Sequence, residues 1–196
     1  MMNIMNRVYI NYKGVFYMKI LVLTVSPHKK VTSSMMADYF IEGAKSVGNE
    51  VVRIDTAFMN INSCRGCGYC RKNNDKCIQD DDMKYVVKDL LDADMVVFVT
   101  PLYYFGITSQ LKKVIDRFYA PNQTLRSQNK QSMLLVSGAA DNEIVMEAVK
   151  MHYLTMLKYL NWEDRGILTA TGVSVREEME KSEFPEKARK LGESIK

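Results

Sequence analysis

Short, nearly continuous runs of apolar residues alternate along the chain with longer segments whose apolar residues recur every three or four positions. The continuous runs predict buried strands at residues 19–25, 50–55, 95–100, 133–137 and 166–171. The segments with helical spacing lie at residues 33–47, 82–91, 109–119, 142–160 and 185–195. Strands that alternate with helices in this way predict βαβ units, a parallel sheet and right-handed crossovers.

This order of elements predicts an α/β fold. We expect a three-layer sandwich in which a five-stranded parallel sheet lies between two layers of helices, with the doubly wound strand order 2-1-3-4-5. The sequence contains no internal repeat, no low-complexity tract and no linker. A single domain is therefore expected over residues 18–196.

Residues 1–17 are expected to form an N-terminal extension to that domain. They hold no continuous apolar stretch and no small-residue cleavage site, so they do not resemble a targeting peptide. The run MKIL that begins at Met18 looks like a natural start of the chain. The alternation of Val8, Ile10 and Tyr12 also permits a short strand, and the sequence leaves both interpretations open.

Composition narrows the class of protein. Of the 196 residues, 47% are apolar, and a net charge of +4 is spread without a block of like charges, so no nucleic-acid partner is indicated. No apolar run reaches the roughly 20 residues that span a membrane. The four cysteines fall at positions 64, 67, 70 and 77, a clustering that indicates reduced thiols available for metal or redox chemistry in a cytoplasmic protein.

Ligands of doubly wound sheets bind beyond the carboxyl ends of the strands, so the loops after strands one, three and four are the places to seek chemistry. The first loop is rich in hydroxyl groups and leads into a helix N-terminus, where unpaired backbone N–H groups favour a phosphate. Its hydroxyl residues are Ser26, Thr32, Ser33 and Ser34. The alternative is that Thr32 or Ser33 only caps the helix. The chain has neither a P-loop lysine motif nor a GxGxxG sequence, so an ATPase or a dinucleotide fingerprint is not indicated.

The other two loops suit a flat heteroaromatic ring. The second loop places three aromatic side chains between a strand and a helix, where a ring system would lie against them or where they would instead plug the sheet edge. Its residues are Pro101, Leu102, Tyr103, Tyr104, Phe105 and Gly106. The third loop has small residues, Ser137, Gly138 and Ala139, which permit close approach of a ligand to the backbone or form a simple turn into a helix.

Together these segments resemble the NAD(P)H-dependent FMN reductase branch of the flavodoxin-like superfamily. The resemblance covers nearly all of residues 18–196 and depends on MKILVLTVSPHKKVTSS, on CRGCGYC followed by Asp81-Asp82-Met83, and on TPLYYFGITSQLKKVIDRF. It implies a flavodoxin-like three-layer sandwich that binds FMN and uses NAD(P)H as co-substrate.

The resemblance also assigns roles to the loops by position. It implies that Ser26, His28, Thr32, Ser33 and Ser34 hold the FMN phosphate. It implies that Pro101 to Gly106 hold the isoalloxazine, with Ser137 to Ala139 at its edge. The chain departs from the family at Val25, His28 and Thr32, where the family usually has Gly, Arg and Asn.

The spacing Cys64-x2-Cys67-x2-Cys70-x6-Cys77 resembles the compact motif of the iron-sulfur flavoproteins, a subgroup of the same superfamily. Four thiolates are the usual ligands of a 4Fe-4S cluster, and glycines between them let the loop turn toward successive corners of the cluster. Structural zinc more often uses two separated pairs of ligands. Similar segments in FMN reductases serve only as a loop near the flavin or at a dimer contact, and this alternative stays open.

The leading hypothesis is an FMN-dependent oxidoreductase that takes a hydride from NAD(P)H. The resemblance implies that its acceptor is a quinone, a flavin, a nitro compound or a redox protein. It also implies that the chain forms a homodimer or a higher homo-oligomer, to whose flavin site Tyr69 or the aromatic loop contributes. A second hypothesis is an iron-sulfur flavoprotein that carries electrons without turning over a small molecule. A third is a flavodoxin-like scaffold without a cofactor, which Val25 and His28 suggest.

Overall fold

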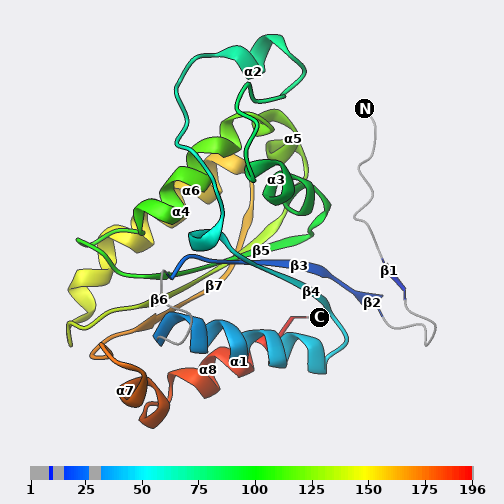
Figure 1. Cartoon of the computed structure of the whole chain (residues 1–196). Coiled ribbons are helices and arrows are strands. Elements are labelled where there is room, and N and C mark those ends of the chain that lie inside the picture. Colours follow the sequence, from blue (N-terminus) through cyan, green and yellow to red (C-terminus); the bar gives the residue numbers. More distant parts are fainter. Residues whose placement is uncertain (1–8, 11–15, 27–31, 196) are drawn as a thin grey trace.

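Five parallel strands form the centre of the molecule (Figure 1). The computed structural model describes residues 9–10, 16–26 and 32–195. The strands are β3 (Lys19–Thr24), β4 (Glu50–Asp55), β5 (Met95–Pro101), β6 (Gln131–Ser137) and β7 (Glu163–Ala170). They pair in the order β4-β3-β5-β6-β7, so the predicted order 2-1-3-4-5 is confirmed.

Helices cover both faces of the sheet, which confirms the three predicted layers (Figure 1). One layer contains α1 (Thr32–Ser46), α7 (Arg176–Lys181) and α8 (Phe184–Glu193). The other contains α3 (Met83–Asp92), α4 (Ser109–Asp116), α5 (Asn122–Ser127) and α6 (Glu147–Leu160).

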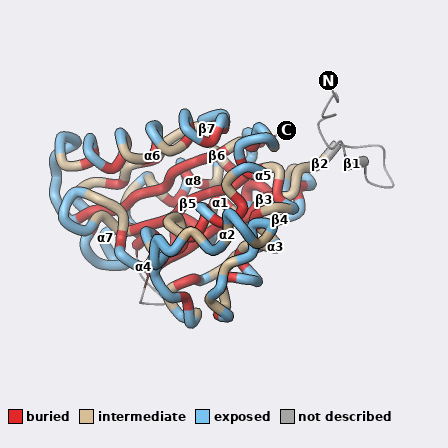
Figure 2. Tube along the Cα trace, turned by 90° about the horizontal axis from the view of Figure 1, so that it is seen from above, coloured by how far each residue is buried: buried red, intermediate tan, exposed pale blue. Residues whose placement is uncertain are grey.

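Alternate residues of each strand enter different cores. Leu21 and Leu23 pack with the layer of α3 to α6, whereas Ile20 and Val22 pack with the layer of α1 and α8. Successive side chains of a strand point to opposite faces, so a strand covered on both faces needs apolar residues at every position. This explains why β3, β5 and β6 read as continuous apolar runs and are buried along most of their length, whereas the edge strands β4 and β7 are only partly covered (Figure 2).

The structure differs from the expected elements at short segments. It adds η1 (Thr56–Phe58), α2 (Tyr69–Lys72), α5 and α7, and it replaces the ends of two predicted helices by the 3₁₀ turns η2 (Arg117–Tyr119) and η3 (Glu143–Met146). Strand β7 also begins three residues before the predicted start. A bulge lies between its pairs Ser132–Asp164 and Leu134–Ile167, and it interrupts the apolar pattern there.

Part of the N-terminal segment pairs with itself. Strands β1 (Tyr9–Ile10) and β2 (Phe16–Tyr17) form an antiparallel two-stranded sheet. Ile10 of the predicted short strand lies in β1, whereas Val8 and Tyr12 lie outside the described residues. The proposed boundary at residue 18 stays a prediction. Among the described residues no helix is long and apolar enough to cross a membrane.

Helix α1 is held in place by α8. The helices cross at Gly43 and Gly192, where an added Cβ would overlap the carbonyl oxygens of Arg189 and Phe40 respectively. Glycine at both positions therefore permits the backbones to approach closely. This contact fixes the direction of α1 and with it the position of its N-terminus at the carboxyl edge of the sheet.

Candidate functional site

Ser137, the last residue of β6, joins the three predicted loops at one edge of the sheet. The hydroxyl oxygens of Ser137 and Thr32 are 2.9 Å apart in a buried hydrogen bond, which links the third loop to the first. The backbone N–H of Leu102 donates to the Ser137 carbonyl oxygen at 2.7 Å, which links the third loop to the second. The structure thus brings together loops that are far apart in the sequence.

The first loop ends in three buried hydroxyl residues, Thr32, Ser33 and Ser34, in the first turn of α1. The Ser33 hydroxyl is 1% exposed and has no hydrogen-bond partner among the described residues, so it does not cap the helix. Ser26 is also buried at the end of the preceding strand. His28 lies in residues 27–31, outside the described part of the chain.

The second loop is a tight turn of aromatic residues. Tyr103 and Gly106 exchange two backbone hydrogen bonds of 3.0 Å, and the residues between them, Tyr104 and Phe105, have φ of 46° and 63°. Two positive φ angles are typical of a type I′ turn, which favours Asn and Gly and is strained for aromatic residues. Strain of this kind is retained where it serves a function.

The aromatic side chains of this turn face outward. Tyr103, Tyr104 and Phe105 are 50%, 99% and 57% exposed, so they do not plug the sheet edge. The base of the loop is fixed, because the Thr108 N–H donates to the Thr100 hydroxyl at 3.3 Å and the Thr108 hydroxyl caps α4 by accepting from the Leu111 N–H. The turn therefore presents aromatic surface from a rigid base.

The third loop is packed more tightly than its small residues suggest. A Cβ at Gly138 would come within 2.9 Å of the Met146 side chain and 3.4 Å of the Leu102 Cβ. The Gly138 N–H and carbonyl also bond to the backbones of Ala170 and Val173. The Gly138 backbone therefore bonds to other parts of the protein. Of the three small residues of this loop, only Ala139 is exposed and open to the predicted close approach of a ligand.

A buried ion pair closes the segment that carries the cysteines. Arg117 Nη1 and Nη2 lie 2.8 Å and 3.2 Å from the two oxygens of Asp81, and Nη1 also donates to the Asn62 carbonyl at 2.9 Å. The side chains of Arg117 and Asp81 are only 2% and 1% exposed. Asp81 further accepts from the N–H groups of Asn62 and Met83. The two ends of the segment at 62 and 81 are thereby held together.

The ion pair governs the charge states of both groups. Burial acts to raise the pKa of Asp81, but the hydrogen bonds from Arg117, Asn62 and Met83 outweigh it and hold that pKa below its usual value. Burial likewise acts to lower the pKa of Arg117, and Asp81 reverses this effect so that the pKa is raised. Both groups are charged at neutral pH, as a buried pair requires.

Both partners belong to segments that resemble the family, but the sequence alone gives neither of them a role. No periodicity or local motif pairs residues 36 positions apart, so only the fold identifies Asp81 and Arg117 as partners. The sequence does hold one chemical signal. Arg117 is followed by Phe118 and Tyr119 at the end of an amphipathic helix, where a solvated charge is unusual.

All four cysteines line one cavity, together with Arg117 and residues of α2. No carboxylate is among the lining residues. The four soft thiols suit iron-sulfur chemistry or zinc, and Gln79, whose buried amide oxygen has no hydrogen-bond partner, lines the same cavity. The Gly66 N–H already donates to Cys64 Sγ at 3.5 Å. Among the described residues, no three His, Cys, Asp or Glu side chains are close enough to hold a metal ion, so a metal would have to draw the thiols inward.

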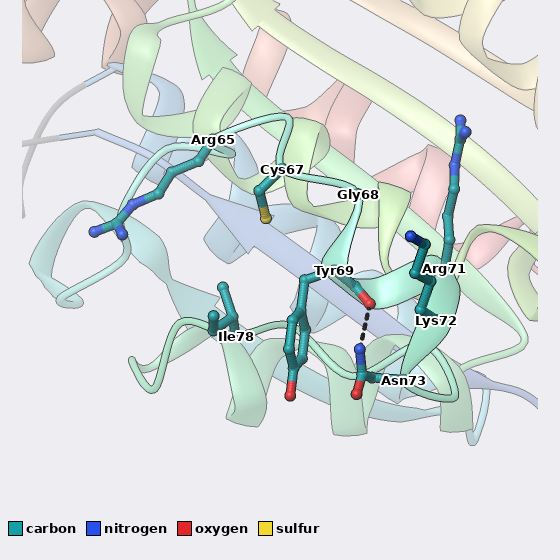
Figure 3. A pocket seen from close by; sticks show the side chains of 8 residues that line it. All are labelled: Arg65, Cys67, Gly68, Tyr69, Arg71, Lys72, Asn73 and Ile78. Carbon is teal, nitrogen blue, oxygen red and sulfur yellow. Dashed lines mark hydrogen bonds between the residues drawn. The ribbon is translucent and has the colours of Figure 1, made fainter.

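The outer face of the cysteine segment is basic. Arg65, Arg71 and Lys72 line a surface hollow that also includes Cys67 and Tyr69 (Figure 3). Arg65 and Arg71 extend away from the Cys67 thiol in this view. The hollow therefore combines an exposed cysteine with positive charge.

The family described as flavodoxin-like fold matches residues 18–195 of the chain. An iron-sulfur flavoprotein of Archaeoglobus fulgidus is 32% identical over 130 residues, 65% of this chain and 59% of that protein. An iron-sulfur flavoprotein of Methanocaldococcus jannaschii is 36% identical over 100 residues, 51% of this chain and 50% of that protein. An FMN-dependent NADH:quinone oxidoreductase of Bordetella parapertussis is 29% identical over 103 residues, 47% of this chain and 49% of that protein. The matches span about half the length of these relatives, or somewhat more.

Solved structures share the fold at low sequence identity. An NAD(P)H:quinone oxidoreductase from Methanothermobacter marburgensis superposes with a TM-score of 0.73 at 17% identity, covering 92% of this chain and 96% of that one. An FMN-dependent NADH-azoreductase from Bacillus anthracis, in complex with FMN, gives 0.69 at 15% identity, covering 89% and 97%. Identities this low support the architecture and nothing finer.

Replacement of Asp81 by Asn tests the ion pair. It leaves the Arg117 cation buried without its counter-charge, so we expect the free energy of unfolding at pH 7 to fall by about 3–5 kcal/mol. Because folding lowers the pKa of Asp81, its stabilisation is complete above the unfolded value near 3.8 and is lost as pH falls through the lower folded value. Urea denaturation from pH 6 to pH 2 should therefore show a weaker acid dependence in Asp81→Asn.

The matched control is Asp80→Asn, because Asp80 is exposed and pairs only with the exposed Lys84. Its unfolding curve should coincide with that of the wild type at pH 7. Equal stability of Asp81→Asn and Asp80→Asn would contradict the role assigned to the buried pair.

A second prediction concerns the backbone strain in the aromatic turn. The double variant Tyr104→Asn/Phe105→Gly supplies the residues that a type I′ turn prefers, so we expect unfolding to require about 1–3 kcal/mol more. Tyr103→Asn, next to the two strained positions and at negative φ, is the control and should give no such gain. Urea denaturation measures both, and a destabilised double variant would show that the turn is not strained.

Proposed function

The chain belongs to the flavodoxin-like fold family, and from this membership we propose that it is an FMN-dependent oxidoreductase. The observation that carries the proposal is the convergence of three loops on Ser137 at the carboxyl edge of the sheet, beside the buried and unpartnered hydroxyl of Ser33. Doubly wound sheets bind their ligands at this edge. Relatives named as FMN-dependent or iron-sulfur flavoproteins support the choice of ligand.

The start of α1 suits the phosphate of FMN. Its first turn offers backbone N–H groups and the positive end of the helix dipole, both of which favour an anion. A buried hydroxyl without a partner is costly, and a phosphate oxygen is a partner of the right chemistry for Ser33. In this proposal Ser26, His28, Thr32 and Ser34 complete the phosphate site.

The aromatic turn suits the isoalloxazine ring. In this proposal Tyr103, Tyr104 and Phe105 cover a face of the ring, while the backbone of residues 101–106 and of Ala139 meets its polar edge. Ser137 and Gly138 hold these loops in place through their bonds to Leu102, Ala170 and Val173. The strain at Tyr104 and Phe105 is then the cost of holding aromatic surface exposed in the free protein.

Bound FMN supplies the redox chemistry, accepting a hydride from NAD(P)H and releasing electrons in pairs or singly. In this proposal the chain's own residues bind and orient the cofactor. We propose a small acceptor such as a quinone or a flavin, or a redox protein. We also propose a homodimer or higher homo-oligomer in the cytoplasm.

A second candidate is an iron-sulfur flavoprotein that carries electrons between partners. The observation that favours it is that Cys64, Cys67, Cys70 and Cys77 line one cavity without a carboxylate. The relatives named as iron-sulfur flavoproteins give it further support. In this candidate the four thiolates hold a 4Fe-4S cluster beside FMN.

Ser33→Ala tests the phosphate site. Removal of a hydroxyl that lacks a partner should leave the stability of the FMN-free protein nearly unchanged. Loss of a hydrogen bond to a charged phosphate should weaken FMN binding by roughly 10- to 100-fold. Fluorescence titration with FMN measures the dissociation constant.

Ser46→Ala at the other end of α1 is the control for this experiment, because Ser46 bonds only to the Gly43 carbonyl. It should bind FMN with wild-type affinity. Equal affinities for Ser33→Ala and wild type would place the phosphate elsewhere.

Anaerobic stopped-flow mixing with NADPH and with NADH separates the two candidate functions. Rapid bleaching of the FMN absorbance is expected of the reductase, because hydride transfer removes the oxidised flavin band. Bound FMN that neither nucleotide bleaches would favour the carrier. Protein that binds no added FMN would contradict both and favour a scaffold without a cofactor.

A further inference from the structure

One cysteine of the cysteine segment faces both its interior and its surface. The inner cavity, about 20 Å³ in volume, is lined by all four cysteines of the chain, Cys64, Cys67, Cys70 and Cys77. Of the four, Cys67 alone also lines the surface hollow, and its sulfur points toward the side of the hollow where Tyr69 and Ile78 lie (Figure 3). A small molecule that enters the hollow would therefore meet Cys67 first.

Cys70 is placed to act as a second thiol behind Cys67. It lies in α2, is only partly exposed, and lines the inner cavity together with Cys67. Between the two, Gly68 has φ of 68°, a conformation that glycine adopts without strain, and the chain enters α2 there. Cys-x-x-Cys is the spacing of dithiols that pass reversibly into a disulfide.

Cys64 stands at the same spacing on the other side of Cys67 but suits this role less well. Its sulfur accepts a hydrogen bond from the Gly66 N–H at 3.5 Å. It is also exposed, as Cys67 is, so it would react with the small molecule directly. A second thiol that is sheltered from the substrate reacts instead with the first thiol, and Cys70 meets this condition better.

The hollow outside Cys67 favours negatively charged molecules. It has a volume of about 580 Å³, and its lining includes Arg65, Arg71 and Lys72 but no carboxylate. Within the described part of the chain, none of these three cations belongs to an ion pair. Tyr69 and Ile78, which are 39% and 56% exposed, add apolar surface. The hollow therefore suits a small organic molecule that carries carboxylates.

We propose that Cys67 and Cys70 form a thiol–disulfide exchange site, and that the hollow makes this site selective for small disulfides that carry negative charge. The Cys67 thiolate attacks one sulfur of the substrate, whose S–S bond breaks, so a mixed disulfide forms and one substrate thiol leaves. The Cys70 thiolate then attacks the Cys67 sulfur, which closes the protein disulfide and releases the second substrate thiol.

The exchange is balanced without a further reactant. Two electrons pass from the protein dithiol to the substrate disulfide, and the two protons of the protein thiols go to the two product thiols. The steps use no metal and no flavin. The inference therefore goes beyond both candidate functions and rests on neither.

The test uses the full chain with the changes Cys64→Ser and Cys77→Ser, in which Cys67 and Cys70 are the remaining thiols. One equivalent of dithiobis(nitrobenzoate), a disulfide with two carboxylates, is added to this reduced two-thiol chain under anaerobic conditions. We expect two coloured thiolates per reagent molecule and, by mass spectrometry, a protein disulfide without adduct. The further change Cys70→Ser should stop the reaction at the mixed disulfide, with one thiolate released.

Arg65→Gln/Lys72→Gln in the two-thiol chain tests the selectivity of the hollow. We expect the second-order rate constant with dithiobis(nitrobenzoate) to fall about tenfold, because the attraction of the anion is lost. The rate constant with uncharged dithiodipyridine should be unchanged. Lys76→Gln/Lys88→Gln is the matched control, since it removes two positive charges at exposed positions that do not line the hollow. It should react with both reagents as the two-thiol chain does.

Three outcomes would overturn the inference. A stable adduct on Cys67 of the two-thiol chain, with one thiolate released, would show that Cys70 does not complete the exchange. Equal losses of rate with the charged and the uncharged reagent would show that the hollow does not select by charge. Wild-type protein in which iron and sulfide occupy Cys67 and block its reaction would leave no exchange site. If the two-thiol chain does not fold, the wild type takes its place, and peptide mass mapping identifies the bridged pair.

Discussion

The buried ion pair of Arg117 and Asp81 is the interaction on which the cysteine segment depends. Removal of two charges from water is expensive, and the cost is recovered only where the geometry is good and the remaining polar atoms are satisfied. Asp81 meets this condition, since it accepts two bonds from Arg117 and further bonds from Asn62 and Met83. The residues between 62 and 81 contribute almost nothing to the core. Their position therefore follows from the clamp at their base rather than from burial.

Helix α4 connects this ion pair to the aromatic turn, which lies just before the start of the helix. The helix is capped by Thr108 just after the turn, packs Leu111 and Val114 into the core, and ends where Arg117 begins η2. An eight-residue helix spans about 12 Å. Because one rigid element carries both, the turn and the cysteine cavity keep a fixed relation to each other.

The sequence predicted the strands well and the site only in part. Strands buried on both faces leave a continuous apolar run, so β3, β5 and β6 could be predicted, whereas the bulge near Asp164 hid the start of β7. Short helices such as α2 have too few turns to show a period. The three loops were found because parallel strands end at a common edge. The ion pair was not, because a contact between residues 36 positions apart is a property of the fold.

Three costly features of the described structure lie where the sequence predicts a ligand, whereas two other buried side-chain oxygens without partners, those of Gln128 and Gln131, lie elsewhere. The Ser33 hydroxyl and the Arg117 Nε–H are buried without partners, and Tyr104 and Phe105 have positive φ in an exposed turn. Packing explains none of them, since each would be relieved by a common substitution. Native proteins retain few such costs, and those that remain concentrate at functional sites. Their coincidence with the predicted phosphate, ring and cysteine positions is therefore a stronger argument for bound redox groups than any one loop provides.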